Sequence, residues 1–467
     1  MLKITSKIKP IVLCILDGWA IARDAPGNAI TRANPQNFNR LWFSYPHTYL
    51  TAFGRSVGLP EGYVGNSEVG HENLGAGRIV FQDLLRINTA ISNGSFFENE
   101  AFLSAIDHIN KNNASIHLMG LVGLGAVHSN TAHLLALLQF LKNEHVASNR
   151  VKIHIFTDGR DSPPASARSY IAEISNQINR QSLGQIVSVS GRYFAMDRDN
   201  RWERTQLAYN ALIGISQYHS YSPLDSIEKA YIEGITDEFI KPTVIVDVNG
   251  SPVGAISKND AVVFFNYRAD RARQLTRALT LDDFKTIRTT SGDIVPTFNR
   301  GPKIPNIFFV TLTQYDKELP TSAVAFSQDE VVMPLARVFS ERNMRQLHIA
   351  ETEKYAHVTY FFNGGKEAPF VGETRILVNS QKVASYDQKP EMSTPEVTRQ
   401  LLTRLNAKTY DFAVVNLANA DMVAHTGNIE ATSLAVKCVD DHLGVIVKAT
   451  LAQQGAIVIT ADHGNAE

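Results

Sequence analysis

The stretch IVLCILDG, residues 11–18, shows the pattern on which the fold is built: an apolar run followed at once by an acid and a glycine. Similar β-branched runs, each followed by a polar or glycine-rich loop and a helix-like stretch, recur at residues 151–156, 261–265, 413–417 and 456–460. Apolar runs of this length fit strands that are buried on both faces of a parallel sheet. Their alternation with helical stretches predicts an α/β fold.

Length and composition narrow the class of protein. A chain of 467 residues is too long for one ordinary core, so two domains are expected. Apolar and charged shares of 44% and 19% are typical of a globular enzyme, and a net charge of −1 indicates neither a nucleic-acid nor a membrane-surface partner. Two cysteines, Cys14 and Cys438, cannot build a disulfide framework. The first apolar run is too short for a signal or spanning segment, so we expect a cytoplasmic protein.

Acids and imidazoles follow apolar runs near both ends of the chain. They are Asp17, Asp421, His425, Asp462 and His463. On a helical turn, Asp421 and His425 would share one face because they are four residues apart. Mixed carboxylate and imidazole ligands suit Mn²⁺, Zn²⁺ or Fe²⁺. Each motif alone is as well explained as a turn after a strand, but their recurrence favours a metal site.

A second candidate site lies in GNSEVGH, residues 65–71, where glycines around Ser67 would let the backbone approach a ligand closely. A serine hydroxyl becomes a nucleophile only when a base or a metal draws off its proton. The alternative is a glycine-rich hairpin or a helix N-cap at Ser67. Taken alone, this loop does not identify a nucleophile.

Arginines, by contrast, gather after apolar runs in the middle of the chain, at positions Arg160, Arg192, Arg198, Arg268 and Arg271. Guanidinium groups match phosphate and carboxylate oxygens, so arginines at successive strand ends predict an anion pocket. Surface ion pairs are the alternative, and Arg201 and Arg204 fit it. His128, Lys354 and His357 are single polar residues that their surroundings alone would class as structural.

Acids and imidazoles thus follow apolar runs near both chain ends, whereas arginines follow those in the middle. This distribution predicts a domain formed by both chain ends and a second domain inserted between them. We expect the chain to cross near residues 81–88 and 313–319. The predicted domains are a metal-binding domain of residues 1–81 and 316–467 and an inserted substrate-binding domain of residues 82–315. Metals and arginines both stabilise charge on a transferring phosphoryl group, so phosphoryl transfer fits best.

As a set, the motifs resemble the cofactor-independent phosphoglycerate mutases, members of the alkaline phosphatase superfamily, over essentially the whole length. The motifs that carry the resemblance occur in the family's order: LDGWA, GNSEVGHENLGAGR, DGRDSPP, GRYFAMDRDNRWERT, FNYRADRARQ, ETEKYAHVTYFFNGG, YDQKPEMS, DMVAHTGN and TADHGNAE.

The resemblance implies two three-layer α/β domains, one phosphatase-like and one an inserted phosphotransferase domain. It implies two metals, usually Mn²⁺: one held by Asp17, Ser67, Asp462 and His463, the other by Asp421 and His425. The residues implied to bind phosphoglycerate or assist transfer are His128, Arg160, Asp161, Arg192, Arg198, Arg268, Arg271 and Lys354.

The implied reaction is the glycolytic and gluconeogenic interconversion of 3-phosphoglycerate and 2-phosphoglycerate. Ser67 would take the phosphoryl group as phosphoserine while Lys354 and the metals balance charge, and Asp161 would manage the proton of the glycerate hydroxyls. No 2,3-bisphosphoglycerate is then needed. The family also implies a monomer.

One departure from the family bears on activity. The family carries a further metal-ligand histidine after the ADHGN motif, whereas this chain stops at Glu467, so we expect a C-terminally truncated chain: either the sequence is incomplete or this form is impaired. The rival predictions are a phosphomonoesterase or a phosphopentomutase of the same superfamily. A third is a catalytically dead fragment that only binds phosphoglycerate or a protein.

Overall fold

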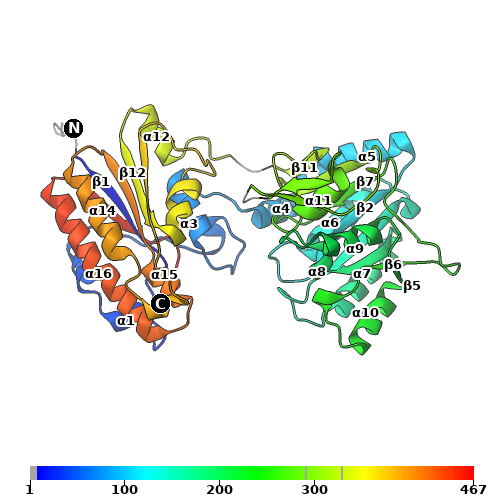
Figure 1. Cartoon of the computed structure of the whole chain (residues 1–467), viewed down its shortest axis with the longest axis horizontal. Coiled ribbons are helices and arrows are strands. Elements are labelled where there is room, and N and C mark those ends of the chain that lie inside the picture. Colours follow the sequence, from blue (N-terminus) through cyan, green and yellow to red (C-terminus); the bar gives the residue numbers. More distant parts are fainter. Residues whose placement is uncertain (1–7, 290–291, 328–329) are drawn as a thin grey trace. The chain divides into compact units, whose positions relative to one another are not determined.

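The computed structural model describes residues 8–289, 292–327 and 330–467. Residues 1–7, with which the first predicted domain begins, lie outside this range. The chain divides into two compact units (Figure 1), the first formed by Met1–Leu85 and Asp329–Glu467 and the second by Arg86–Gln328.

Unit 1 is built on a five-stranded parallel sheet in the order β13-β12-β14-β1-β15. Its strands are β1 Ile11–Leu16, β12 Gln346–Glu351, β13 Glu373–Val378, β14 Phe412–Leu417 and β15 Ala456–Thr460. The central strand β14 is buried along its whole length, as an apolar run between two helical layers must be. Because all five strands run the same way, their carboxyl ends share one edge of the sheet.

Helices cover both faces of this sheet, with α14 and α16 on one side and α3 and α12 on the other (Figure 1). The α-helices of unit 1 are α1 Ala29–Ala33, α2 Gln36–Ser44, α3 Ser67–Ala76, α4 Asp83–Asn93 (which continues into unit 2), α12 Leu335–Glu341, α13 Thr352–Ala356, α14 Thr394–Asn406, α15 Asn419–Ala424 and α16 Ile429–Ala452. Shorter turns lie at Gly54–Val57 and Tyr386–Gln388, and a π-helical turn at His357–Phe361 follows α13. The unit is therefore a three-layer α/β domain.

Helix α3 begins and ends by local rules. Asn66 is its N-cap and accepts a hydrogen bond from the backbone N–H of Val69, so Ser67 is the first helical residue rather than the cap. Gly77 ends the helix in the left-handed conformation. Gly70 faces the loop after β15 so closely that a Cβ there would lie 2.5 Å from the carbonyl oxygen of Asp462. That close approach brings Ser67 to the carboxyl edge of the sheet.

Unit 2 is built on an eight-stranded sheet in the order β11-β10-β7-β2-β3-β4-β6-β5. All its pairings are parallel except that of β4 with β6. The strands are β2 Ile116–Val122, β3 Val151–Thr157, β4 Gln185–Gly191, β5 Tyr218–Ser220, β6 Thr243–Ile245, β7 Ala261–Phe264, β10 Phe308–Thr313 and β11 Ala323–Phe326. A separate hairpin pairs β8 Thr286–Arg288 with β9 Ile294–Pro296.

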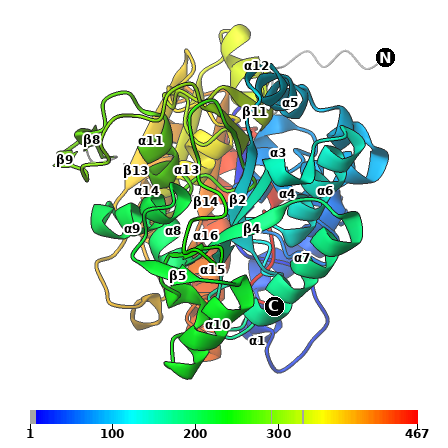
Figure 2. The ribbon, with the colours of Figure 1, turned by 90° about the vertical axis from the view of Figure 1, so that its right-hand side faces the viewer.

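The helices of unit 2 also form two layers, with α9 and α11 on one side of the sheet and α5, α6 and α7 on the other (Figure 2). Their bounds are α5 Glu100–Asn112, α6 Thr131–Asn143, α7 Ala167–Gln181, α8 Arg192–Ala195, α9 Trp202–Leu212, α10 Pro223–Ile232 and α11 Arg273–Thr280. Shorter 3₁₀ turns lie at Ser95–Glu98, Ser148–Arg150 and Asp237–Phe239. The large core beneath α9 and α11 is rich in aromatic rings, including Phe156, Phe264 and Tyr315.

The α/β fold predicted from the apolar runs is confirmed, and each of the five runs is a parallel strand. The first division between the units falls after Leu85, within the predicted crossing at residues 81–88. The second falls after Gln328, beyond the predicted crossing at residues 313–319. The reason for the later second crossing is β11, which pairs with β10 and so keeps the chain in unit 2 beyond the predicted point. No helix within the described ranges is both long enough and apolar enough to cross a membrane.

Candidate active site

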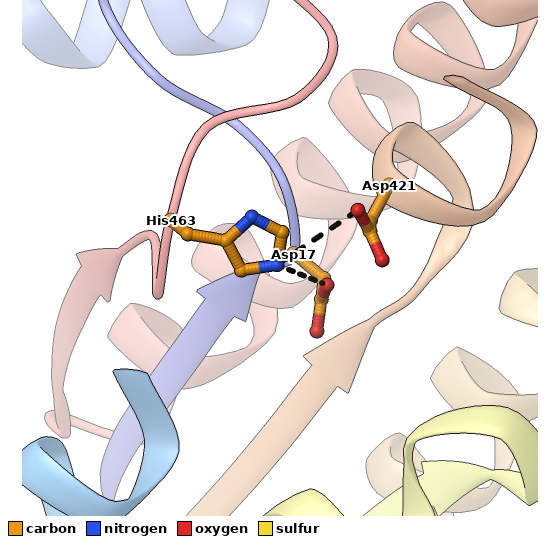
Figure 3. A group of neighbouring side chains, drawn as sticks. All are labelled: Asp17, Asp421 and His463. Atoms are coloured by element: carbon orange, nitrogen blue, oxygen red, sulfur yellow. Dashed lines mark ion pairs between the residues drawn. The ribbon is translucent and has the colours of Figure 1, made fainter. Parts of the chain in front are cut away.

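The polar residues predicted near both chain ends meet at the carboxyl edge of the unit 1 sheet. Asp17 follows β1, Asp421 lies on α15 after β14, and Asp462 and His463 follow β15. Figure 3 shows Asp17, Asp421 and His463 turned toward one another, with His463 Nε2 3.6 Å from Asp17 Oδ1 and 3.8 Å from Asp421 Oδ1. Open α/β sheets place their ligands at this edge.

Ser67 lies in the middle of this group. Its Oγ donates to Asp17 Oδ1 at 3.2 Å and lies 2.9 Å from Nε2 of His463. The Nδ1 of His463 lies 3.0 Å from the carbonyl oxygen of Gly464, to which it can donate. When the ring is neutral, Nε2 then carries the lone pair that faces Ser67. The serine therefore donates to a carboxylate and lies beside an imidazole that can accept its proton only while the ring is neutral.

Lys354 is the cation of the group. It lies on α13, immediately after β12, and its Nζ donates to Asp17 Oδ1 at 2.6 Å, Asp421 Oδ2 at 2.5 Å and Ser67 Oγ at 2.6 Å. Burial alone would lower the pKa of Lys354, but the charges of Asp17, Asp421 and Asp462 raise it above its ordinary value. The lysine thus stays charged beside the serine oxygen.

The charges of the group also set its other pKa values. Burial alone would raise the pKa of Asp17, but the charge of Lys354 and the neighbouring His463 hold it well below its usual range. Burial would lower the pKa of His463, but Asp17 and Asp462 raise it to about 9. Without a metal, the ring is therefore protonated at neutral pH.

The residues fit a divalent cation. Asp17, Asp421 and His463 offer ligand atoms that all lie within 4.8 Å of one another. Asp462 Oδ2 is buried and accepts no hydrogen bond from any residue that the structure describes, which leaves it free to bind an ion. Three carboxylates face one lysine and one protonated imidazole, so the group keeps excess negative charge that a divalent ion would neutralise.

His425, the other imidazole predicted to bind metal, lies at the edge of the group. It caps the C-terminal end of α15, and its Nε2 lies 3.3 Å from Asp421 Oδ1 as the four-residue spacing predicts. Its side chain is 65% exposed, unlike the other acids and imidazoles of the site.

In unit 2, the arginines and acids predicted to bind substrate lie at the carboxyl ends of its own strands. Arg192, directly after β4, is buried, and its Nη1 donates to Asp158 at 2.6 Å and to Asp161 at 2.5 Å. Both acids follow β3. The guanidinium of Arg192 therefore fixes the position of Asp161, whose side chain is 22% exposed.

The remaining arginines surround this pair. Burial lowers the pKa of Arg271, and the charges of the nearby Arg192, Arg198 and Arg160 lower it further. Side chains of Arg160, Arg198 and Arg268 remain 56%, 48% and 52% exposed, so their donors are accessible to an anion. Such a concentration of positive charge, only partly balanced by acids, is typical of a phosphate or carboxylate pocket.

His128 belongs to the same cluster. Its Nε2 lies 3.9 Å from Asp161 Oδ2 and its Nδ1 lies 3.5 Å from Asp270 Oδ1. Burial, together with the charges of Arg192 and Arg268, lowers the pKa of His128 to about 4. The ring is therefore neutral at pH 7 and can donate one hydrogen bond to a ligand.

Several residues of both clusters were not predicted from the sequence. Asp158 and Asp270 hold the arginines of unit 2, and His71 and Asn416 lie beneath the serine in unit 1. An asparagine inside the apolar run of β14 is the one sequence signal for Asn416, since a buried strand rarely holds an amide without a partner.

Comparison with known proteins agrees with this geometry. Residues 87–317 match the family model described as the BPG-independent PGAM N-terminus. The 2,3-bisphosphoglycerate-independent phosphoglycerate mutase of Thermomicrobium roseum is 52% identical over 98% of this chain and 85% of its own length. The chain belongs to the family of 2,3-bisphosphoglycerate-independent phosphoglycerate mutases. The mutase of Methanococcoides burtonii, at 49% identity over 98% of this chain and 86% of its own, is another relative.

A solved structure of the phosphoglycerate mutase family extends the likeness to the fold. The phosphoglycerate mutase of Leishmania mexicana, determined at low cobalt concentration, superposes with a TM-score of 0.66 at 28% sequence identity. The superposition covers 98% of this chain and 83% of that one. The likeness to this mutase therefore extends over both units of the chain.

Proposed function

We propose that this chain interconverts 3-phosphoglycerate and 2-phosphoglycerate through a phosphoserine at Ser67, without 2,3-bisphosphoglycerate. The observation that carries the proposal is the position of Ser67 Oγ, within hydrogen-bonding distance of Asp17, His463 and Lys354 at once. Ser67 is also the first residue of α3, and the N-terminus of a helix favours phosphate.

The residues of unit 1 have different roles in the first phosphoryl transfer, from the substrate to Ser67. Asp17 accepts the hydrogen bond through which Ser67 loses its proton, and the Nζ of Lys354 donates to the oxygen that attacks phosphorus. Asp17, Asp462 and His463, with Ser67, would hold one divalent metal, and Asp421 with His425 would contribute to a second. Bound there, such metals would lower the pKa of the Ser67 hydroxyl and neutralise charge on the phosphoryl group. We propose Mn²⁺ for both positions.

The residues of unit 2 hold the glycerate. Arg160, Arg198, Arg268 and Arg271 bind the carboxylate and phosphate of the substrate, and His128 donates from its neutral ring. Asp161, held by Arg192, takes the proton from one glycerate hydroxyl and returns it to the other. Phosphate then moves from Ser67 to the second oxygen, which completes the exchange without a phosphorylated carrier.

The cellular location and the oligomeric state of the enzyme are part of the same proposal. Both cysteines, Cys14 and Cys438, are free thiols, as is usual in the reducing cytoplasm where glycolysis takes place. The substrate is a small phosphorylated acid, and the arginines of one chain supply its anion contacts. We therefore propose a cytoplasmic enzyme that acts as a monomer.

The test is conversion of 3-phosphoglycerate followed by ³¹P NMR, with Mn²⁺ present and 2,3-bisphosphoglycerate absent. We expect 2-phosphoglycerate to accumulate, chelation to stop the reaction, and Ser67→Ala to lower kcat by at least about 10³-fold because no other nucleophile takes its place. Asn73→Ala, on the same helix but away from the serine, is the matched control.

Two outcomes would overturn the proposal. Release of inorganic phosphate in place of 2-phosphoglycerate would assign a phosphomonoesterase. Conversion that survives Ser67→Ala would show that the phosphoryl group does not pass through this residue.

A further inference from the structure

His71 and Asn416 form a buried polar pair directly beneath the proposed nucleophile. His71 lies on α3, one turn after Ser67, and Asn416 lies on β14 next to β1. Both side chains are almost wholly inaccessible to solvent. Buried polar groups of this kind are costly unless their hydrogen bonds hold something in place.

The hydrogen bonds of Asn416 fix its orientation. Its Nδ2 donates to Asp17 Oδ2 at 2.6 Å and lies 3.0 Å from Nε2 of His71, whereas its Oδ1 has no partner among the described residues. A flipped amide would place Oδ1 against the carboxylate of Asp17 at that short distance, which charge repulsion forbids. The amide nitrogen therefore faces both neighbours.

This orientation determines the tautomer of His71. Because Asn416 donates to Nε2, that nitrogen carries the lone pair, and the ring proton must be on Nδ1. Nδ1 lies 2.8 Å from the carbonyl oxygen of Ser67 and 3.2 Å from Oδ2 of Asp462. The N–H on Nδ1 thus donates to the backbone of the serine, and the same nitrogen lies beside a carboxylate of the site.

The same geometry excludes His71 as a metal ligand, although it lies within ligand distance of Asp17 and Asp462. Its one lone pair is engaged by Asn416, and its other nitrogen carries a proton directed at oxygen. A ligand to an ion needs a lone pair aimed at the ion.

We propose that His71 and Asn416 are positioning residues that lock Ser67, Asp17 and Asp462 into the arrangement that binds metal. This inference rests on the proposed function and names two further residues on which it depends. Groups that orient metal ligands typically change metal affinity by 10–100-fold when they are removed.

The test measures Mn²⁺ binding to the full chain from the electron paramagnetic resonance signal of the free ion. We expect His71→Leu to raise the dissociation constant at least about tenfold, in line with the loss of an orienting partner. His71→Asn, whose amide can donate from near the Nδ1 position, should restore most of the affinity, whereas His71→Gln, which reaches only toward Asn416, should not. The matched control is His357→Leu, since the His357 ring lies 5.4 Å from that of His71 and its Nδ1 has no hydrogen-bond partner among the residues that the structure describes.

Two further measurements separate positioning from mere packing. Urea unfolding of the chelated chain reports stability, and a packing role would lower stability in His71→Leu and His357→Leu alike without lowering Mn²⁺ affinity in the folded chain. Asn416→Leu should weaken binding, and the double variant should lose less than the product of the two single losses because both residues act through one network.

Unchanged Mn²⁺ affinity in His71→Leu would overturn the inference while leaving an active wild-type chain and its proposed function intact. Equal losses in His71→Leu and His357→Leu, or no difference between His71→Asn and His71→Gln, would overturn it as well. A wild-type chain that binds Mn²⁺ but does not convert 3-phosphoglycerate would instead overturn the proposed function alone.

Discussion

At the scale of single residues, the charge balance around Lys354 explains much of the site. Its Nζ is buried between Asp17 and Asp421, two carboxylates that would repel each other without it. Removing one partner of a buried ion pair typically costs about 3–5 kcal/mol because the remaining charge is left uncompensated. A divalent cation at the same carboxylates would supply the missing positive charge.

Lys354→Met should therefore lower the unfolding free energy of the metal-free chain by about 3–5 kcal/mol, and by clearly less when Mn²⁺ is present. Urea unfolding with chelator and with Mn²⁺ measures both values. Lys437→Met, at an exposed position on α16, is the control and should leave stability nearly unchanged. An equal loss with and without Mn²⁺ would show that no cation binds these carboxylates.

The sequence predicts some of these residues and not others, for physical reasons. Asp17 and Asp462 directly follow apolar runs, so their place at the edge of a parallel sheet could be predicted. Asn416 lies inside an apolar run, and its role depends on β14 lying next to β1 almost 400 residues away in the sequence. Neighbours of that kind are fixed by the order of strands, which spacing along the chain does not reveal.

At the scale of elements, helix α3 packs directly against the loop after β15. An alanine Cβ at Gly70 would lie 2.5 Å from the carbonyl oxygen of Asp462 and 2.6 Å from its Cβ. Neither atom belongs to the flexible end of a side chain, so helix and loop must move apart. That movement would carry Ser67 away from the ligands that follow β15.

We expect Gly70→Ala to lower kcat/KM by about 10–100-fold, because a displacement of about 1 Å can cost that much in an aligned site. Steady-state assay of 3-phosphoglycerate conversion tests this expectation. Gly27→Ala is the control, since a Cβ there would meet nothing within 4 Å. Wild-type kinetics in Gly70→Ala would show that the helix need not touch the loop for activity.

A buried histidine on α6 gives unit 2 a dependence on pH. Burial lowers the pKa of His133 to about 3, and its Nε2 lies 3.0 Å from Asn88 Oδ1. The unfolded chain binds a proton near pH 6.5, whereas the folded chain does not until about pH 3. The stability contributed by the neutral ring is thus complete above pH 6.5 and is lost as the pH falls toward 3.

Between pH 7.5 and 5.5 this histidine alone should lower the unfolding free energy by about 1.4 kcal/mol, and His133→Leu should remove that share. Urea unfolding followed by the fluorescence of Trp202, in a chain with Trp19→Phe and Trp42→Phe, isolates unit 2. His219→Leu, at an exposed position on β5, is the control. An unchanged pH dependence in His133→Leu would contradict the lowered pKa of His133 in the folded chain.

The elements themselves could be predicted better than their boundaries. All five quoted runs are strands, because β-branched apolar runs between polar loops have few other stable places in an α/β protein. The second crossing was placed too early because β11, a short strand of only partly buried residues, carries a weak apolar signal. Its membership in unit 2 comes from pairing with β10, which is a tertiary contact.

At the scale of the whole molecule, the two units carry complementary chemistry. Unit 1 combines residues from both ends of the chain, so Asp17 and Asp462 meet only once the fold is complete. Unit 2, a continuous segment, gathers the arginines. The first is suited to hold metals and a nucleophile, and the second to hold an anion, which together are what a phosphoryl transfer within one molecule requires.

The most direct test of this account is to trap the intermediate. The chain with Mn²⁺ is mixed with 3-phosphoglycerate carrying ³²P, quenched in acid within milliseconds, digested and mapped by mass spectrometry. We predict label on the peptide that contains Ser67, formed and discharged at rates no slower than turnover. Label on another residue, or turnover with none on the protein, would contradict the claim that Ser67 carries the phosphoryl group.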